Sequence, residues 1–289
     1  MTATNLQTQS QILKPFFSTV YHIKTLYLFT KSDIKTTILP DLCIAISLTR
    51  QTSHVHILNT VLWIWILLLA FCVSNQASIQ SVVEDTINKP WRPIPSSRVT
   101  IDQARTLRWI LVIINLIFST YHGNLKAAAI FLSADFAYND LGLSAWWFTK
   151  SLLNAVGYAS FQYGAVIVAS GSNGFVHPKA TEAVLTFCLL ILTTIQAQDF
   201  YDAKGDGAGG RQTIVTLYPA LSRALTAIAI TAWAVVLPIF WGIAFVPSMV
   251  FTLLGTFVAG RFTVPGDQKA DEASYLHYNV RIVPSVNRS

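Results

Sequence analysis

Charge is scarce in this sequence. Asp, Glu, Lys and Arg make up only 12% of its 289 residues, whereas soluble domains carry about 25%. Hydrophobic residues make up 53% and gather in long runs between polar inserts. This composition excludes an ordinary soluble domain and predicts an integral membrane protein that crosses the bilayer several times.

Cysteine is scarce too. Cys43, Cys72 and Cys188 all lie in apolar runs without CxxC spacing, which argues against disulfides and zinc and favours small core residues. The net charge of +6 predicts basic cytoplasmic loops and no nucleic-acid partner, because Lys and Arg accumulate on the inner side of membrane proteins. About 35 mixed polar residues precede the first apolar run, so we expect no cleavable signal peptide.

Eight apolar runs are expected to form helices in the membrane. They lie at about 36–48, 55–73, 106–121, 125–137, 145–169, 180–196, 220–240 and 241–258. The first is weak because it contains Pro40 and Asp41, and several fall short of the ~20 residues that span a bilayer. We assign residues 1–35 to a cytoplasmic or interfacial N-terminal segment, 36–260 to the transmembrane domain and 261–289 to a polar C-terminal tail.

The most unusual polar stretch is QDFYDAKGDGAGGRQT, residues 198–213. Asp199, Asp202 and Asp206 are spaced i, i+3 and i+7, which places three carboxylates on one helical face. They follow a nearly uncharged run, where unpaired acids are costly. Clustered oxygen ligands suit Mg²⁺, so we predict a Mg²⁺ site here. The alternative from spacing alone is a solvated acidic loop after a membrane helix.

The polar inserts are expected to meet on one face of the membrane. Four predicted spans separate residues 74–105 from residues 198–215, and an even number returns the chain to the same side. The turn at 138–144 follows two of those spans and lies on that side too. Most of the loop Lys and Arg residues lie there, which predicts a cytoplasmic face.

The first insert contains an acidic pair followed by NKPWRPIP. Its prolines fix φ and block helix formation, which holds Lys89 and Arg92 beside Glu84 and Asp85. Basic groups on a stiff loop suit a diphosphate, and Arg binds its oxygens in a bidentate manner. Taken alone, the acids fit a surface loop and the bases fit a positive-inside anchor. Together with the second acidic stretch they predict a Mg²⁺–diphosphate site.

These motifs resemble those of the UbiA-type superfamily of intramembrane prenyltransferases and cyclases. The resemblance covers roughly residues 25–260 and rests on four features: Asn75-Gln76, Glu84-Asp85 with NKPWRPIP, the Tyr138-Asn139-Asp140 turn, and QDFYDAKGDGAGGRQT. It implies an all-α bundle of about eight to nine transmembrane helices around a central cavity, the ninth being doubtful here. It also implies a Mg²⁺-dependent enzyme that ionises an isoprenyl diphosphate beside membrane lipid.

The resemblance and the chemistry together assign candidate roles. The expected metal ligands are Asn75, Glu84, Asp85, Asp199, Asp202 and Asp206. The expected diphosphate-binding residues are Lys89, Arg92, Lys204 and Arg211. Asn139 and Asp140, on the active face, join the three aspartates of the second stretch as catalytic candidates. Aromatic side chains in the spans, Tyr138, Tyr158 and Phe161 among them, are candidates to stabilise a carbocation, the alternative being ordinary bilayer aromatics.

The first motif departs from the family pattern. Gln76 stands where an acid is usual, and Ser97 stands where a glycine is usual, so we expect a weaker first metal site. The residues of the motifs resemble those of a fungal group of the superfamily most closely, which favours a terpene cyclase, with a prenyltransferase as the alternative. An inactive homologue and an ion-binding transporter are further alternatives. The prenyl chain length, the acceptor and the oligomeric state are left open.

Overall fold

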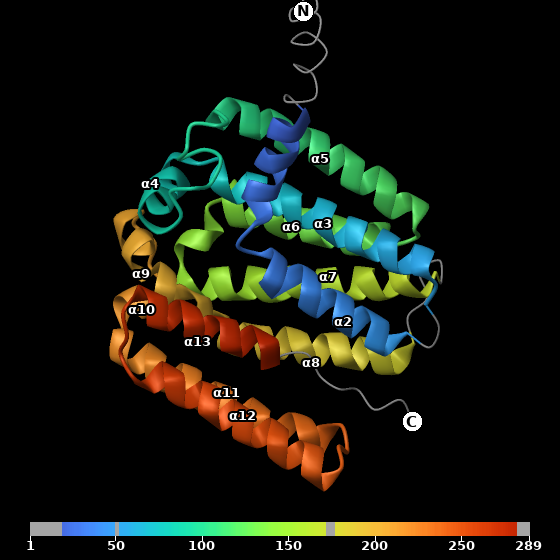
Figure 1. The fold of residues 1–289 in the computed structure, drawn as a ribbon, viewed down its shortest axis with the longest axis vertical. Coiled ribbons are helices and arrows are strands. Elements are labelled where there is room, and N and C mark those ends of the chain that lie inside the picture. Colours follow the sequence, from blue (N-terminus) through green and yellow to red (C-terminus); the bar gives the residue numbers. More distant parts are fainter. Residues whose placement is uncertain (1–18, 50–51, 172–176, 282–289) are drawn as a thin grey trace, which may run out of the picture.

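The computed structural model describes residues 19–49, 52–171 and 177–281, and the regular elements in these ranges are helices (Figure 1). A helical segment at 19–30 comes first. In chain order there follow η1 Ile34–Ile38, α2 Leu39–Leu48, α3 His54–Gln76, α4 Ile79–Asn88, α5 Ile101–Tyr121, α6 Leu125–Asn139, η2 Leu143–Ala145, α7 Trp147–Ser170, α8 Pro178–Thr194, η3 Ile195–Gln198, α9 Asp199–Ala208, α10 Ile214–Leu217, α11 Pro219–Phe240, α12 Phe245–Thr263 and α13 Gln268–Arg281.

The predicted membrane runs are largely helical. The segments long and apolar enough to cross a bilayer are α3, α7, α11, α12 and the continuous stretch Pro178–Ala208. These segments make the protein an integral membrane protein. Helices α2 and α6 occupy predicted runs but have only 10 and 15 residues. The count of eight to nine spanning helices therefore stays a prediction.

Local sequence signals set several helix starts. Thr100 and Gln103 form a capping box at the start of α5, in which each side chain accepts a hydrogen bond from the other residue's backbone N–H. Ser53 and Ser78 cap α3 and α4 from one side only, because each serine side chain accepts a backbone N–H without a reciprocal bond. These caps satisfy backbone donors at helix ends, and they fix where the polar inserts give way to helix.

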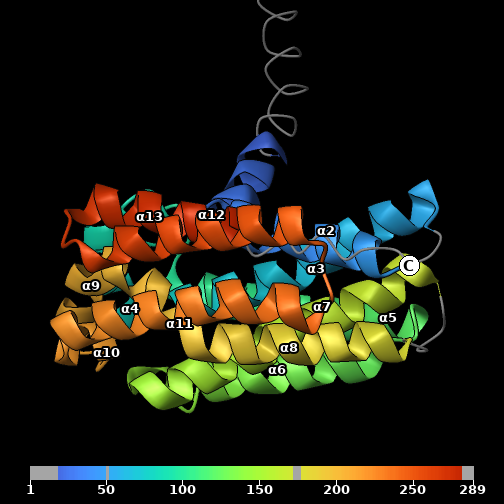
Figure 2. The same cartoon turned by 90° about the horizontal axis from the view of Figure 1, so that it is seen from below.

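The long helices lie side by side, and the short helices α4, α9 and α10 gather at one end of the bundle (Figures 1 and 2). Helix α4 packs directly against α9, so the two polar inserts meet as predicted. Gly205 and Gly209 permit this approach, because a Cβ at these positions would collide with Asn88 and Glu84 respectively. The contact brings two segments that are 114 residues apart in the sequence, at Asn88 and Asp202, into one site.

The C-terminal segment differs from the prediction. Residues 268–281, which the sequence assigned to a polar tail, form α13, and α13 packs against α9 and α12. Tyr275 and Tyr278 are buried in that contact, and Asp271 pairs with Arg223 at 2.8 Å. The helix looks polar because its buried face is built from tyrosine, serine and asparagine rather than aliphatic side chains. At 14 residues it is shorter than a full span.

The described part of the N-terminal segment also contributes to the bundle. Phe29 is fully buried, and its carbonyl accepts a hydrogen bond of 3.0 Å from Gln76 Nε2 at the end of α3. Asp33 lies in the turn between this helical segment and η1. Asp33 is therefore placed next to the insert that follows α3, where Arg92 Nη2 lies 3.8 Å from its Oδ2.

Candidate active site

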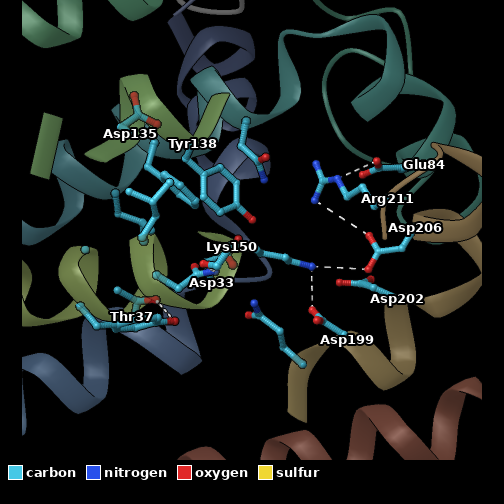
Figure 3. A pocket seen from close by; sticks show the side chains of 18 of the residues that line it. Asp33, Thr37, Glu84, Asp135, Tyr138, Lys150, Asp199, Asp202, Asp206 and Arg211 are labelled. Carbon is cyan, nitrogen blue, oxygen red and sulfur yellow. Dashed lines mark hydrogen bonds and ion pairs between the residues drawn. The ribbon is translucent and has the colours of Figure 1, made fainter. Parts of the chain in front are cut away.

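A cavity opens among η1, α3, α4, α6, α7 and α9, and its empty space, counted out into open solvent, is about 1010 Å³. Its two ends differ in chemistry. One end is lined by acids and bases from α4, α9 and the start of α7, and the other by Leu68, Phe71, Phe131, Tyr158 and Phe161. Figure 3 shows Glu84, Lys150, Asp199, Asp202, Asp206 and Arg211 facing one another at the polar end, with Thr37 and Asp135 on the opposite side.

Lys150 stands at the centre of the polar end. It lies in the first turn of α7, and its Nζ lies 2.8 Å from Asp199 Oδ1 and 3.5 Å from Asp206 Oδ2 (Figure 3). All three side chains are buried. A single ammonium group thus holds the first and third aspartates of the predicted motif together, since two buried carboxylates at this separation need a shared cation.

Asp202 turns to a different partner. Lys89 Nζ donates to its two carboxylate oxygens at 2.9 and 3.0 Å. Asn88 Nδ2 donates to its backbone carbonyl at 3.0 Å. The proline-rich loop and the second acidic stretch therefore touch directly, as the sequence predicted.

Glu84 completes the link between α4 and the end of α9. Arg211 Nε lies 2.8 Å from Glu84 Oε1, and Arg211 Nη1 lies 3.9 Å from Asp206 Oδ1. Burial raises the pKa of Glu84 from 4.5 to about 7, against the opposing pull of Arg211. Glu84 therefore gives up its proton less readily than an exposed glutamate.

Arg92 anchors the basic loop. Its Nη1 donates to both oxygens of Asp85 at 2.8 and 3.0 Å, and Nη2 lies 3.8 Å from Asp33 Oδ2. The loop folds on itself, with Arg92 N donating to the Lys89 carbonyl at 3.0 Å. Ser97 has a φ of 57°, so the position where the family usually has glycine does adopt the left-handed conformation that favours glycine.

The donor chemistry at this end suits a hard divalent cation. Two buried amide oxygens, Asn75 Oδ1 and Asn88 Oδ1, have no hydrogen-bond partner in the described structure. The lining side chains from described residues include neither Cys nor His. Within the described ranges no three His, Cys, Asp or Glu side chains converge as a ligand group. Each predicted acid instead has a Lys or Arg partner. The residues present fit Mg²⁺, because their carboxylate and amide oxygens are the ligands that this cation prefers.

The structure does not bring every predicted site residue to the cavity. Asn139 and Asp140 do not line it: Asn139 Nδ2 donates to Asp135 Oδ1 at 2.7 Å, and Asp140 accepts from Arg108 at 2.7 and 2.5 Å. Helix α6 continues through Asn139, so it turns Asp135 and Tyr138 toward the cavity and the next two residues away.

One further expectation differs in the same way. Lys204 is exposed and does not line the cavity, because its position on α9 faces away from the three aspartates. Among the glycines of the acidic stretch, Gly205 and Gly209 face α4. Gly207 has open space around it.

Residues 38–280 match the model of the UbiA prenyltransferase family. The chain belongs to this family. As a UbiA protein with this cavity, it is an enzyme of the prenyltransferase and terpene cyclase class.

Individual UbiA relatives and structures agree with the family assignment. The chain is 32% identical to fumagillin beta-trans-bergamotene synthase of Aspergillus fumigatus, over 91% of this chain and 90% of that protein. It is 28% identical to polyprenyl transferase eriF of Hericium erinaceus, over 71% of this chain and 72% of that protein. A UbiA homologue from Archaeoglobus fulgidus, solved with GPP and Mg²⁺, has the same fold, with a TM-score of 0.63, 15% identity and coverage of 90% and 99%.

Sequence reasoning missed several cavity residues of this UbiA chain. Lys150 is the most central of them, and Asp135, Asp33 and Tyr201 also line the cavity. A lone lysine near the start of a predicted span falls under the rule that polar groups at membrane depth tend to face a cavity, and so does Asn154. Asn154 does line the cavity, so applying the rule to Lys150 would have found it.

Proposed function

We propose that this UbiA protein is a Mg²⁺-dependent terpene cyclase that ionises an isoprenyl diphosphate on the cytoplasmic face of the membrane. The observation that carries the proposal is the two-ended cavity, in which a cluster of acids and bases adjoins an aromatic, apolar chamber. A prenyl diphosphate has the same two halves, a doubly charged head and a hydrocarbon tail. The head matches the α4–α9 end and the tail matches the α3–α6–α7 end.

The charged end provides the groups that ionisation requires. Asp199, Asp202 and Asp206 on one side and Asn75, Glu84 and Asp85 on the other would hold Mg²⁺, which supplies charge neutralisation to the leaving diphosphate when bound. The bases that pair with these acids line the same end and are available to bind phosphate oxygens: Lys89, Arg92, Lys150 and Arg211. Stabilising the departing charge in a buried site is where most of the rate enhancement is expected.

The apolar end protects and guides the cation. Phe131 and Phe161 meet edge to face with ring centroids 4.6 Å apart, and Phe71 contacts Phe131 at 6.2 Å. Aromatic faces attract a positive charge, and apolar walls exclude the water that would quench it. A prenyl chain folded against these rings is held close to its own reacting double bonds.

The cyclase is favoured over the prenyltransferase by the relatives. The bergamotene synthase matches nine-tenths of both chains, whereas the polyprenyl transferase matches less of each and at lower identity. The transferase remains the second candidate, because it uses the same donor and the same ionisation step. An ion-binding transporter is disfavoured, since the acids lie at helix ends beside a proline-rich basic loop.

The test is a product assay on membranes that contain the protein. Ten-, fifteen- and twenty-carbon prenyl diphosphates are supplied with Mg²⁺, with and without aromatic acceptors, and both diphosphate release and terpene products are measured. Volatile terpene without acceptor is the expected result. Product formed only with acceptor would establish the transferase instead.

The same assay tests the assigned site. Asp202→Asn should lower the rate of diphosphate release by ~10²-fold or more, because loss of one electrostatic interaction that stabilises the transition state typically lowers the rate by that factor. Absence of diphosphate release from every substrate by the unaltered protein would refute both candidate activities.

A further inference from the structure

One acidic side chain of the cavity lies apart from the charged end. Asp135 of α6 is only 3% exposed, and it lines the cavity on the side opposite Lys150 and Asp206 (Figure 3). Among the described residues its ion-pair partner is Arg108 of α5, with 3.7 Å between Arg108 Nη2 and Asp135 Oδ2. Asn139 Nδ2 donates to its Oδ1 at 2.7 Å. The partners of Asp135 thus come from behind the cavity wall and not from the bases of the charged end.

Arg108 does not balance the charge of Asp135, because it binds a second carboxylate more closely. Its two terminal nitrogens donate to the two oxygens of Asp140 at 2.7 and 2.5 Å. Arg108 is itself buried, so one guanidinium serves two carboxylates away from solvent. When all three groups are ionised they carry one excess negative charge. Asp135 is the carboxylate of this pair that lines the cavity, so the excess charge faces the cavity.

Aromatic rings flank Asp135 on the same face of α6. Phe131 lies one turn before it and Tyr138 one turn after it, and all three side chains line the cavity. Phe71 of α3 contacts both rings edge to face, with centroids 6.2 Å from Phe131 and 5.8 Å from Tyr138. These rings belong to the chamber that the hydrocarbon would fill. The carboxylate therefore lies in the wall of that chamber, beside the surfaces that would hold a carbocation.

The last step of a cyclisation requires a base. A cyclic carbocation becomes a neutral olefin only when a carbon next to the charged carbon gives up a proton. Aromatic rings stabilise the cation but accept protons poorly, whereas a carboxylate accepts a proton readily. The other acids that line the described cavity pair with the bases of the charged end. Asp135 is the carboxylate whose position and excess charge suit this step.

We propose that Asp135 is the general base that ends the reaction by taking a proton from the cyclised carbocation. The inference rests on the proposed terpene cyclase function. The C–H bond next to the charged carbon breaks, its electron pair forms the double bond of the product, and the proton binds the Asp135 carboxylate. When the olefin leaves and water re-enters, the proton passes to water. The net reaction converts a prenyl diphosphate into a cyclic olefin, diphosphate and a proton.

Asp135 is the catalytic residue in this step, and its two partners are positioning residues. The amide N–H of Asn139 and the guanidinium of Arg108 both favour the ionised carboxyl group, although burial opposes it. A carbocation in the adjoining chamber favours the ionised form further. The 3.7 Å separation from Arg108, longer than the contacts of Arg108 with Asp140, leaves the Asp135 carboxylate available to accept a proton.

The test follows the fate of the carbocation in membranes that contain the full-length protein. The prenyl diphosphate that gives terpene with the unaltered protein is turned over in H₂¹⁸O, and diphosphate, olefin and alcohol are measured together. In Asp135→Asn, we expect the share of released diphosphate that is recovered as the parent olefin to fall by ~10²-fold, since a positioned general base typically contributes that factor. The missing product should appear as terpene alcohol that carries oxygen-18, or as olefin isomers.

Asp140→Asn is the matched control. It removes the closer carboxylate from Arg108 but lies outside the described lining of the cavity, so it should keep the parent olefin as its main product. A second pair guards against a folding defect in Asp135→Asn. Asp135→Glu should form olefin and Asp135→Gln should not, because these side chains have nearly the same size and only the glutamate can accept the proton. Melting temperatures of all four variants in detergent show which of them remain folded.

The outcomes separate the inference from the proposed function. Parent olefin as the main product of Asp135→Asn or Asp135→Gln would overturn the inference and leave the cyclase intact. An equal loss of olefin in Asp140→Asn would also overturn it, because the role of Asp135 would then be to hold Arg108. So would a loss of diphosphate release in Asp135→Asn as large as that in Asp202→Asn. Failure of the unaltered protein to release diphosphate would refute the proposed function and the inference with it.

Discussion

The Lys150 ammonium nitrogen lies 2.8 Å from Asp199 Oδ1 at the point where α7 begins and α9 begins, with Asp206 completing the group at 3.5 Å. This contact ties the middle of the chain to its second acidic motif. It gives the acids of the metal-free protein a cation, so the carboxylates remain close together without repelling one another. The contact also makes Lys150 the residue whose removal is most informative.

Replacing Lys150 should destabilise the metal-free protein. Lys150→Met keeps most of the side-chain volume but leaves Asp199 and Asp206 buried without their cation, which typically costs about 3–5 kcal/mol. Thermal unfolding in detergent with a chelator should show this as a lower melting temperature. Excess Mg²⁺ should restore part of the lost melting temperature, since a ligand that binds the folded state stabilises that state. An unchanged melting temperature would show that the ion pairs contribute little.

Substitutions at Lys89 and Lys204 should differ sharply in their effect on activity. Lys89→Met removes a cation that contacts the Asp202 carboxylate, so we expect a loss of ~10²-fold in the rate of diphosphate release. Lys204→Met changes an exposed side chain outside the cavity and should leave the rate within about twofold. Equal losses from both changes would contradict the placement of Lys204.

Two glycines of the acidic stretch provide a matched pair. A methyl group at Gly209 would collide with the Glu84 side chain, so Gly209→Ala should push α9 from α4 and lower diphosphate release at least tenfold. The methyl group of Gly207→Ala would meet nothing within 4 Å, so this variant should release diphosphate at nearly the rate of the unaltered protein. Rates of both variants at saturating Mg²⁺ would measure the difference. An unchanged rate of diphosphate release in Gly209→Ala would mean that activity does not depend on the spacing of α4 and α9.

Stability should depend on pH through Glu84. Its pKa is raised from 4.5 to about 7, so between these values the folded chain holds a proton that the unfolded chain lacks. Unfolding then releases a proton. The free energy of unfolding therefore falls as pH rises from 4.5 to about 7. Glu84→Gln, which cannot ionise, should flatten the curve of melting temperature against pH in Mg²⁺-free detergent solution. A curve identical to that of the parent would contradict the raised pKa.

Much of the fold could be predicted from the sequence because membrane burial leaves a strong pattern. Apolar runs marked the positions of α3, α7, α8, α11 and α12, and span parity predicted that α4 and α9 meet. Helix α13 was missed because its buried face is polar, so apolarity carries no signal there. A search for apolar runs does not detect a helix whose buried face is formed by tyrosine and asparagine.

The candidate site was predictable where the residues form motifs and unpredictable where the contacts depend on rotation of a helix. The spacing of Asp199, Asp202 and Asp206 indicated a shared face, yet Asp202 turns to Lys89 while the other two share Lys150. Motif adjacency also suggested Asn139 and Asp140, whereas α6 presents Tyr138 and Asp135 to the cavity. Periodicity gives a face of a helix, but the partners on that face come from distant segments.

The pairing of every predicted acid with a lysine or arginine bears on how the protein is made. Inserting a carboxylate-rich helix end into a membrane is unfavourable while the carboxylates are unneutralised. Because the loop after α4, helix α7 and the residues after α9 bring their own cations, the newly synthesised chain can assemble this end of the bundle before any metal arrives. Biogenesis of the protein should then be insensitive to the supply of Mg²⁺ during translation, and only its turnover should depend on it.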